Sequence, residues 1–354
     1  MAYRWGLARA NSRYRSWALR SRSSTPGSSP GSTADRSRSK PRASNAFRSM
    51  FGTNNGIAGK VLAGAGTQAQ QAAWLPRLAD GAVASFALTE PEAGSDPSGL
   101  STRAVRDGED WVISGAKRFI TNAPLADLFV VFARTNPNAQ STRGISVFLV
   151  DATLPGVSVG PRDHKMGQFG AWSAEVFLDS VRVPHNALVG EAEGAGFGEA
   201  MKSLVRGRVH IAALCVGMAQ RLLEESVAYA RVNRQGGTPI GEFQLVQPML
   251  AEIQTGVYAG RAMVLQAARD YDSGADRRIG PSAAKLYCSE MVDRAADLAV
   301  QIHGGMGYMR GTPVERMYRD ARLFRIYEGT SEIQKLILGR ALVKDGAVHA
   351  TSAR

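Results

Sequence analysis

The spacing of apolar residues changes twice along this chain, and these changes constrain the fold class most strongly. Apolar residues recur at helical spacing from Phe51 to Leu78, alternate with polar residues from about Val83 to Val183, and return to helical spacing from Gly196 to Val343. The pattern predicts a short helical segment, a β domain and a helical bundle, in that order. We place their bounds at 49–81, 82–190 and 191–346, with a tail over 347–354.

The first 48 residues differ in composition from everything that follows. They hold ten Arg and one Lys against a single acid, Asp35, and are rich in Ser, Pro and Gly over 23–32. Such a segment buries too little apolar surface to offset its ordering entropy, so we predict a disordered basic segment. It resembles an organellar transit peptide, and the equal alternative is a mis-started leader. We therefore expect a bacterial cytoplasmic protein, or a mitochondrial matrix protein if the segment is a transit peptide.

The formal net charge of +12 falls to +2 once those residues are set aside. Phosphate binding needs clustered cations, so we expect no nucleic-acid partner, although the basic segment leaves a DNA-associated relative as an alternative. No run of 18 apolar residues occurs, which predicts no membrane span. Cys215 and Cys288 lie among apolar neighbours at helical spacing, which indicates buried reduced thiols. We predict no metal site.

Turn and capping residues set the expected elements. Asp107-Gly108 indicates a hairpin, and Thr67 indicates a helix N-cap with a stop at Pro76. Many short strands without helices between them predict an antiparallel barrel or sandwich, and the long amphipathic helices after it predict a four-helix bundle. The expected strands are Ser85–Leu88, Arg103–Arg106, Trp111–Ser114, Lys117–Thr121, Leu128–Ala133, Ile145–Val150, Val157–Gly160 and Glu175–Leu178; the expected helices include Gly56–Leu62, one from Gly196 past Val227, Phe243–Tyr271, Pro281–Ile302 and Ser331–Val343.

The segment Arg325-Ile-Tyr-Glu-Gly-Thr-Ser-Glu-Ile-Gln334 places an acid, Glu328, between an aromatic residue and a glycine. Thr330 and Ser331 are suited to cap the helix that follows, because their hydroxyls accept from N–H groups of its first turn. A carboxylate held on such a turn, out of bulk water, is suited to general-base catalysis. The segment alone also fits a structural acid on a surface turn, and perturbed acids are fewer than structural ones.

Three further segments have ligand-binding features. Phe86–Asp96 forms a Pro- and Gly-shaped loop whose N–H groups suit an anion or a ring edge. Phe119-Ile-Thr-Asn122 puts a ring and a hydroxyl on one strand face, where a flat heterocycle could stack; an ordinary half-buried strand is the alternative. Gln301-Ile-His-Gly-Gly-Met-Gly307 implies close backbone approach at its glycines. Its His303 fits a helix-end structural histidine better than a catalytic one.

Together these segments resemble the acyl-CoA dehydrogenase family. The resemblance runs from about Gly56 to Val343. Its first signature is Ala87-Leu-Thr-Glu-Pro-Glu-Ala-Gly-Ser-Asp-Pro-Ser-Gly99, and its second runs from Gln301 to Arg319-Asp320. The turn Val181-Arg-Val-Pro184 and the Glu328 segment are further landmarks. In this comparison the N-terminal helical domain of the family is reduced to a remnant at about 51–80.

The resemblance implies an FAD flavoprotein, assembled as a dimer or tetramer, with FAD between the β domain and the bundle. It implies Glu328 as catalytic base, since Gly207 occupies the position where some members carry the base. It implies substrate contacts at Ser95, Arg208, Tyr327 and Gly329. The implied FAD contacts are Phe86, Leu88, Thr89, Gly94, Ser95, Phe119, Ile120, Thr121, Arg234, Gln235, Gln244, Gln301, Gly304, Gly305, Thr330 and Glu332, with 234–244 as part of a helical stretch that reaches the FAD of a neighbouring subunit.

The implied activity is α,β-dehydrogenation of an acyl-CoA thioester to a trans-2-enoyl-CoA. The base removes the α-proton, the β-hydride goes to flavin N5, and an electron-transfer flavoprotein accepts the electrons. A role in β-oxidation or in amino-acid catabolism follows from that activity. The alternatives are an inactive member that lacks a wall of the acyl pocket and an oxidase-like flavoprotein that uses O₂ directly.

Overall fold

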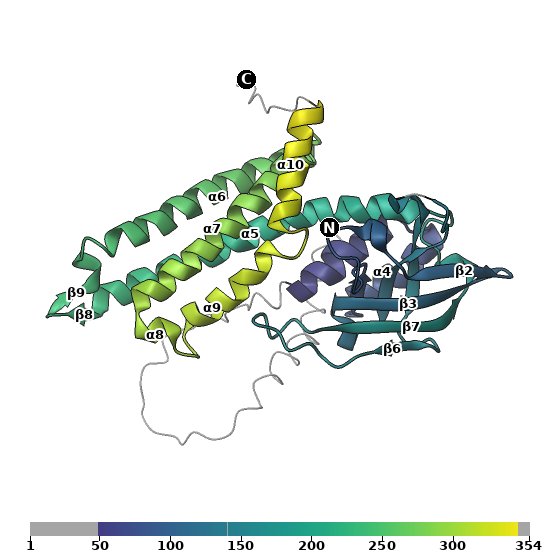
Figure 1. The fold of residues 1–354 in the computed structure, drawn as a ribbon, viewed down its shortest axis with the longest axis horizontal. Coiled ribbons are helices and arrows are strands. Elements are labelled where there is room, and N and C mark those ends of the chain that lie inside the picture. Colours follow the sequence, from purple (N-terminus) through teal and green to yellow (C-terminus); the bar gives the residue numbers. More distant parts are fainter. Residues whose placement is uncertain (1–48, 140, 346–354) are drawn as a thin grey trace, which may run out of the picture. The chain divides into compact units, whose positions relative to one another are not determined.

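The structure is a computed structural model that describes residues 49–139 and 141–345. The segments predicted as a disordered leader and as a tail therefore lie outside the described residues. The chain divides into two compact units. The first contains the residues up to His164 together with Phe169–Met201, and the second contains Lys165–Gln168 and the residues from Lys202 onward. The long helix α5, Ala195–Val232, begins in the first unit and continues into the second (Figure 1).

The first unit is built on a seven-stranded sheet, which confirms the predicted β domain. The strand order is β1-β4-β2-β3-β7-β6, and β5 pairs with β4 outside this path. Most pairings are antiparallel as predicted, but β1 and β2 each run parallel to β4. The strands are β1 Ala84–Ala87, β2 Arg103–Asp107, β3 Asp110–Thr121, β4 Leu128–Arg134, β5 Ile145–Asp151, β6 Val157–Val159 and β7 Ser173–Val183.

Two strands predicted around Gly115 are one continuous strand, β3. Its register against β7 shifts between Ile113 and Gly115 and again between Lys117 and Ile120, so bulges carry the chain through the break that the sequence suggested. Gly115 has φ of 154° and lies against Thr102, where an added Cβ would approach the Cα of Thr102 to 2.8 Å. The predicted hairpin at Asp107-Gly108 is present, with Asp107 opposite Asp110 and Gly108 at φ 66°.

Strand β4 is buried on both faces, which explains its uninterrupted apolar sequence. Phe129 and Val131 pack into one core with Trp111 and Phe148, while Val130 and Phe132 pack into a second core. This second core is covered by η1 Gly52–Ala58, α3 Gly59–Ala65 and α4 Gln68–Ala79. The short N-terminal helices therefore serve as one layer of the β unit.

Helix α4 begins where the sequence predicted and ends later than predicted. Thr67 is the N-cap, and Gln70 completes a capping box by accepting from the Thr67 N–H at 2.9 Å. Pro76 lies inside the helix, which continues to Ala79, so the predicted stop at Pro76 is wrong. Proline removes one N–H and leaves its carbonyl, and the Pro76 carbonyl here accepts from Asp80 at 2.9 Å.

Gln70 also ties α4 to the loop after β7, and its removal is expected to destabilise the β unit. Its Nε2 donates to the carbonyls of Asn186 at 2.7 Å and Leu188 at 2.8 Å. Gln70→Leu leaves the buried Leu188 carbonyl without this donor, and we expect a loss of about 1–3 kcal/mol in unfolding free energy. Urea denaturation followed by tryptophan fluorescence measures it, with Gln68→Leu, at an exposed position of the same helix, as the control. Equal stability of the two variants would show that the tie contributes nothing.

The second unit is a helical bundle, as predicted (Figure 1). Apolar residues of α5, α6 and α7 share one core, in which Cys215 and Cys288 are buried free thiols, also as predicted. Helix α6 ends at Gly274, whose φ of 81° gives the chain a left-handed exit. The helices after α5 are α6 Gln247–Ser273, α7 Ile279–His303, α8 Gly305–Tyr308, α9 Pro313–Ala321, η7 Arg322–Arg325 and α10 Ser331–Asp345.

The segment after α5 differs from its prediction. Arg234–Gln235 and Thr238–Pro239 form a small hairpin, β8 and β9, and a 3-10 turn follows at Ile240–Glu242. Helix α6 begins only at Gln247, so the helical stretch implied over 234–244 is wrong. Gly236 and Gly237 have φ of 54° and 84°, and two consecutive left-handed residues make the tight turn that such a hairpin needs. In the sequence, the dipeptide Gly236-Gly237 is the signal for this turn.

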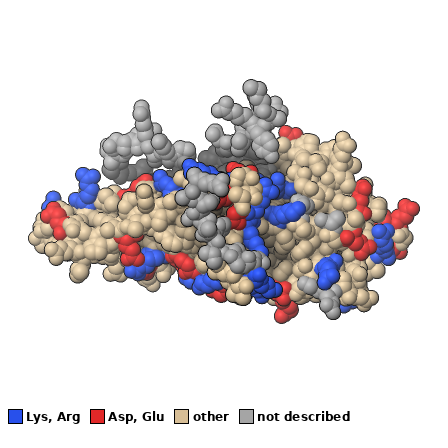
Figure 2. All heavy atoms as spheres, turned by 90° about the horizontal axis from the view of Figure 1, so that it is seen from above, with Lys and Arg blue, Asp and Glu red and all other residues tan. Residues whose placement is uncertain are grey.

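Positive and negative side chains are interspersed on the face of the molecule that Figure 2 presents. Among the described residues, no helix is long and apolar enough to cross a membrane.

Candidate active site

Glu328 lies on a tight turn between η7 and α10, as predicted. Its φ is 57°, and that of Gly329 is 86°, so two consecutive residues are left-handed. For a residue with a Cβ, that conformation costs about 1–2 kcal/mol. Thr330 caps α10 as predicted, because its Oγ1 accepts from the N–H of Ile333 at 3.3 Å. The predicted capping role of Ser331 is wrong, since its hydroxyl donates instead to Glu290 Oε1 at 2.6 Å.

The Glu328 carboxyl group packs against the backbone of α5 at Gly207. A Cβ added to Gly207 would overlap Oε2 and lie 3.0 Å from Cδ of Glu328. Within the described residues, the buried Oε2 atom has no hydrogen-bond partner. Burial raises the pKa of Glu328 to about 7, although the charges of Arg208 and Lys285 act to lower it. A carboxylate with that pKa is suited to accept a proton at neutral pH.

Replacing Gly207 by alanine is expected to impair the carboxyl group without removing it. The helix at Gly207 tolerates alanine well, so the main effect is the overlap of the new Cβ with Glu328. A displacement of about 1 Å costs on the order of 10²-fold in rate when a catalytic group must be aligned. Stopped-flow flavin reduction measures it. Gly217→Ala on the same helix, where an added Cβ meets nothing within 4 Å, is the control. Equal rates of flavin reduction in the two variants would show that a Cβ at position 207 does not displace the Glu328 carboxyl group.

Helix α7 holds the Glu328 turn at three points that sequence reasoning missed. Lys285 donates to the Gly329 carbonyl at 2.7 Å. Glu290 binds both flanks of the turn, accepting from Ser331 and pairing with Arg325 at 3.0 Å. Arg325 also pairs with Asp293 at 3.0 Å. The spacing of Lys285, Glu290 and Asp293 indicated one helix, but not which segment that helix contacts.

Gln334 adds a fourth contact from α10 itself. Its fully buried Nε2 donates to the carbonyls of Glu328 at 3.3 Å and Gly329 at 2.9 Å.

Of the predicted substrate residues, Arg208, Tyr327 and Gly329 lie at this site, and Ser95 belongs to the other unit. Arg208 NH1 is 3.3 Å from Ser282 Oγ; burial lowers the Arg208 pKa, and Glu328 acts to raise it.

In the β unit, the two predicted flavin segments lie side by side. The N–H of Arg118 donates to the Thr89 carbonyl at 2.9 Å, which joins the 86–95 loop to β3. Next to that bond Phe119 has φ of 57° and leaves 61% of its surface exposed. Gly94 has open space where a side chain would begin. An exposed ring beside an exposed loop fits a flat heterocycle such as the flavin of FAD.

A buried ion pair fixes this arrangement and was not predicted from the sequence. Lys117 Nζ is 2.7 Å from Glu90 Oε1 and donates to the Phe132 carbonyl at 2.6 Å. Glu90 also accepts from the N–H groups of Ser101 at 2.7 Å and Thr102 at 3.1 Å. Burial acts to raise the pKa of Glu90, but Lys117 and the hydrogen bonds outweigh it and lower the pKa to about 2.

The other predicted FAD residues of the bundle fall into two groups. Thr330 and exposed Glu332 follow Glu328 directly, whereas Gln301, Gly304 and Gly305 lie where α7 ends, next to the end of α5. Arg234, Gln235 and Gln244 are exposed on the segment that leaves the same end of α5 (Figure 1). From Gly207 to Tyr229 this helix rises about 33 Å. The two groups therefore occupy separate places in the bundle.

The glycines that end α7 leave their backbone open. An added Cβ meets nothing within 4 Å at Gly304 or Gly305, whereas at Gly307 it would contact His303 and Val300. The 304–305 backbone is thus accessible to a bound group. His303 is a helix-end histidine, as predicted: Nδ1 is 2.7 Å from the Ala299 carbonyl, and the ring lies 4.2 Å from Tyr229.

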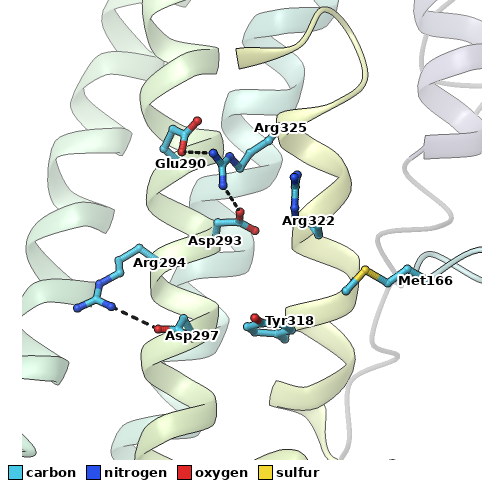
Figure 3. Close-up of a pocket in the computed structure, with 8 residues that line it drawn as sticks. All are labelled: Met166, Glu290, Asp293, Arg294, Asp297, Tyr318, Arg322 and Arg325. Atoms are coloured by element: carbon cyan, nitrogen blue, oxygen red, sulfur yellow. Dashed lines mark hydrogen bonds and ion pairs between the residues drawn. The ribbon is translucent and has the colours of Figure 1, made fainter. Parts of the chain in front are cut away.

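A cavity of about 560 Å³ in the bundle contains none of the predicted site residues (Figure 3). Its acids are largely paired with its own cations, because Arg325 holds Glu290 and Asp293, and Arg294 holds Asp297. Arg325, which lines this cavity, also helps to hold the Glu328 turn on α7. It is lined by Met166, Glu290, Asp293, Arg294, Asp297, Tyr318, Arg322 and Arg325.

Three family models match the chain in succession. They are described as the acyl-CoA dehydrogenase N-terminal domain at residues 40–82, middle domain at 85–181 and C-terminal domain at 194–343. The caffeyl-CoA reductase-Etf complex subunit CarC of Acetobacterium woodii is 42% identical over 82% of this chain and 76% of its own length. The probable acyl-CoA dehydrogenase YngJ of Bacillus subtilis is 44% identical over 79% of this chain and 73% of its own.

Solved structures share the fold. The acyl-CoA dehydrogenase from Geobacillus kaustophilus matches with a TM-score of 0.81 and 36% identity, over 83% of this chain and 78% of that one. A glutaryl-CoA dehydrogenase from Mycobacterium smegmatis, solved in complex with FADH2, matches with a TM-score of 0.79 and 32% identity. That match covers 84% of this chain and 75% of the other.

Proposed function

Because the chain belongs to the acyl-CoA dehydrogenase family, we propose that it dehydrogenates an acyl-CoA thioester with Glu328 as the base. The observation that carries this proposal is the half-buried Glu328, whose buried Oε2 atom packs on Gly207 without a hydrogen-bond partner among the described residues. Its pKa of about 7 leaves a substantial ionised fraction at neutral pH. Structural acids on surface turns do not have this environment, which favours the catalytic alternative.

The α-proton of a thioester is weakly acidic, so its removal needs a placed base and stabilisation of the developing oxyanion. Glu328 provides the base. Its own backbone N–H has no hydrogen-bond partner within the described residues, and we propose that it donates to the thioester oxygen. Arg208 and Lys285 place positive charge near the carboxylate and keep its pKa from rising further.

The cofactor is FAD, which when bound supplies the acceptor for the β-hydride. The residues proposed to hold its ring are those of the 86–95 loop and of Phe119–Thr121. The exposed Phe119 ring offers a stacking surface, and Lys117 with Glu90 fixes the loop beside it. We propose that the open backbone at Gly304 and Gly305, with Arg234, Gln235 and Gln244, serves the FAD of a second copy. The protein would then be a dimer or tetramer.

We propose an electron-transfer flavoprotein as the acceptor of the electrons and a bacterial cytoplasmic location. The name of the A. woodii relative, a subunit of a complex with Etf, supports such a partner. That name also describes a reductase, which supports a second candidate function: reduction of a 2-enoyl-CoA at the same site. Both directions use Glu328, as acceptor of the α-proton in one and as its donor in the other.

An absorbance titration of the purified protein tests both candidates. A flavin spectrum that bleaches anaerobically with one member of an acyl-CoA panel supports the dehydrogenase. Flavin reduced chemically and then reoxidised by an enoyl-CoA, without bleaching by any acyl-CoA, supports the reductase. Rapid reoxidation by O₂ alone indicates the oxidase-like alternative. A flavin-loaded protein that responds to none of these ligands would refute the proposed function.

A further inference from the structure

We propose that Lys285 is a positioning residue for the catalytic base, fixing the Glu328-Gly329 turn through the Gly329 carbonyl while adding a positive charge beside the carboxylate. The proposal rests on the function proposed above. It assigns two separable roles to one buried amine on α7, and each role predicts its own measurable effect.

The positional role follows from where the ammonium group lies. Lys285 is fully buried, and its Nζ is 2.7 Å from the carbonyl of the residue that directly follows Glu328. Glu328 has φ of 57°, a left-handed conformation that is strained for a residue with a Cβ, so the turn needs outside support. The support is crowded: a Cβ on Gly329 would lie 2.6 Å from Nε2 of Gln334. The turn is therefore held from α7 and from α10 at the same carbonyl.

The contact of Gln334 shows that the turn does not need a charged donor at the Gly329 carbonyl. Gln334 already donates a neutral hydrogen bond to the Gly329 carbonyl at 2.9 Å. A second neutral donor would satisfy the remaining lone pair without the cost of burying a charge. The lysine brings a buried charge, which the hydrogen bond to the Gly329 carbonyl does not require. We therefore assign that charge a second role, which is its effect on Glu328.

The electrostatic role concerns the acidity of Glu328. The charged groups that act on Glu328 are Arg208 from α5 and Lys285 from α7, and both favour its ionised form. Those that act on Lys285 are Arg208 and the Cys215 thiol from α5, Glu328, and Glu290 from its own helix. Burial lowers the pKa of Lys285 to about 8, and the acids act to raise it. Lys285 is thus mostly charged at pH 7, the midpoint of Glu328, and loses its charge as the pH rises through about 8.

Four substitutions separate the two roles. Lys285→Gln keeps a hydrogen-bond donor and removes the charge, Lys285→Arg keeps the charge, and Lys285→Met removes both. Gln334→Met removes the neutral donor while leaving the charge in place. The full flavin-loaded chain is used throughout. Flavin content and thermal unfolding show that each variant folds, and Gln334→Met keeps the test usable if a Lys285 variant does not.

The primary readout is an infrared pH titration of the Glu328 carboxyl band, assigned by its loss in Glu328→Gln, without substrate. We expect Lys285→Gln to move the midpoint to higher pH by about one unit, tenfold in ionised fraction. Lys285→Arg should leave it near that of the unchanged protein. Gln334→Met should leave the midpoint unchanged and slow flavin reduction by acyl-CoA at all pH values.

The results distinguish a failure of the roles of Lys285 from a failure of the proposed acyl-CoA dehydrogenase activity. If the unchanged protein is bleached by acyl-CoA but Lys285→Gln titrates at the same pH, the electrostatic role is wrong. If Lys285→Met, which removes the donor as well as the charge, reduces flavin at the full rate above its own midpoint, the positional role is wrong. If no acyl-CoA or enoyl-CoA acts on the unchanged protein, the proposed function fails, while the infrared midpoints still decide whether Lys285 sets the acidity of Glu328.

Discussion

Glu328→Gln is expected to slow flavin reduction by acyl-CoA by about 10²- to 10⁴-fold, the range that a general base contributes. The glutamine side chain fits the same space over Gly207 but accepts no α-proton. Anaerobic stopped-flow absorbance on the flavin-loaded protein measures the rate. Glu109→Gln, an exposed acid on the hairpin turn of the β unit, is the matched control and should behave as the unchanged protein. Full reduction rates in Glu328→Gln would remove the base assignment.

The pH dependence gives an independent check on the same residue. The folded pKa of Glu328 is about 7, so the base form increases as pH rises through 7. The rate of flavin reduction at low acyl-CoA concentration should therefore rise with pH and level off above that value. A rate that is flat from pH 5 to pH 9 would show that Glu328 does not accept the proton.

The same pKa predicts that the base destabilises the fold. Its folded value lies above the value of 4.5 for an ordinary glutamate, so the folded state holds a proton that the unfolded state releases between those pH values. Stability therefore falls as pH rises from about 4.5 to about 7, by up to roughly 3 kcal/mol. Glu328→Gln should unfold at a higher temperature than the unchanged protein at pH 8, and at the same temperature at pH 4.5. Equal melting temperatures at both pH values would mean that the carboxylate is not destabilised.

The sequence predicted the Glu328 turn correctly because the turn is local. Thr330 as cap, Gly329 as left-handed residue and the apolar stripe after Ser331 all act within one or two helical turns. The environment of the carboxyl group is not local. It depends on Gly207, whose absent side chain makes room for it, and on the charges of Arg208 and Lys285. Pairwise contacts between distant segments leave no periodic signal, so the raised pKa was readable only from the fold.

Errors in the secondary structure have similarly specific causes. Pro76 was expected to end its helix, but only one N–H is lost there, and the carbonyl bonds of the last turn remain. The parallel pairing of β1 with β4 depends on tertiary packing, because a strand sequence does not specify its neighbour's direction. The charged pair of Lys117 and Glu90 was missed for a related reason. Alternation indicates which strand positions face a core, but not that a lysine will occupy one with a partner 27 residues away.

Lys117→Met is expected to destabilise the β unit by about 3–5 kcal/mol and to abolish flavin binding, because it leaves Glu90 buried without its cation. Both side chains of the pair are at most 1% exposed, so water cannot replace the lost partner. The 86–95 loop would lose its side-chain link to β3 and keep only the backbone bond from Arg118 to Thr89. Flavin content after purification and the denaturant midpoint measure the two effects.

The double variant Glu90→Gln with Lys117→Met decides between charge and packing as the cause. Removing both charges should recover most of the stability that Lys117→Met loses, since an uncompensated carboxylate is the costly species. Acid provides a parallel test on the unchanged protein: the Glu90 pKa is lowered to about 2, so its contribution is complete above pH 4.5 and lost as pH falls toward 2. Glu90→Gln should flatten that part of the acid profile. If the double variant is as unstable as Lys117→Met alone, the lysine acts through its packing and its bond to Phe132, and the ion pair does not position the flavin loop.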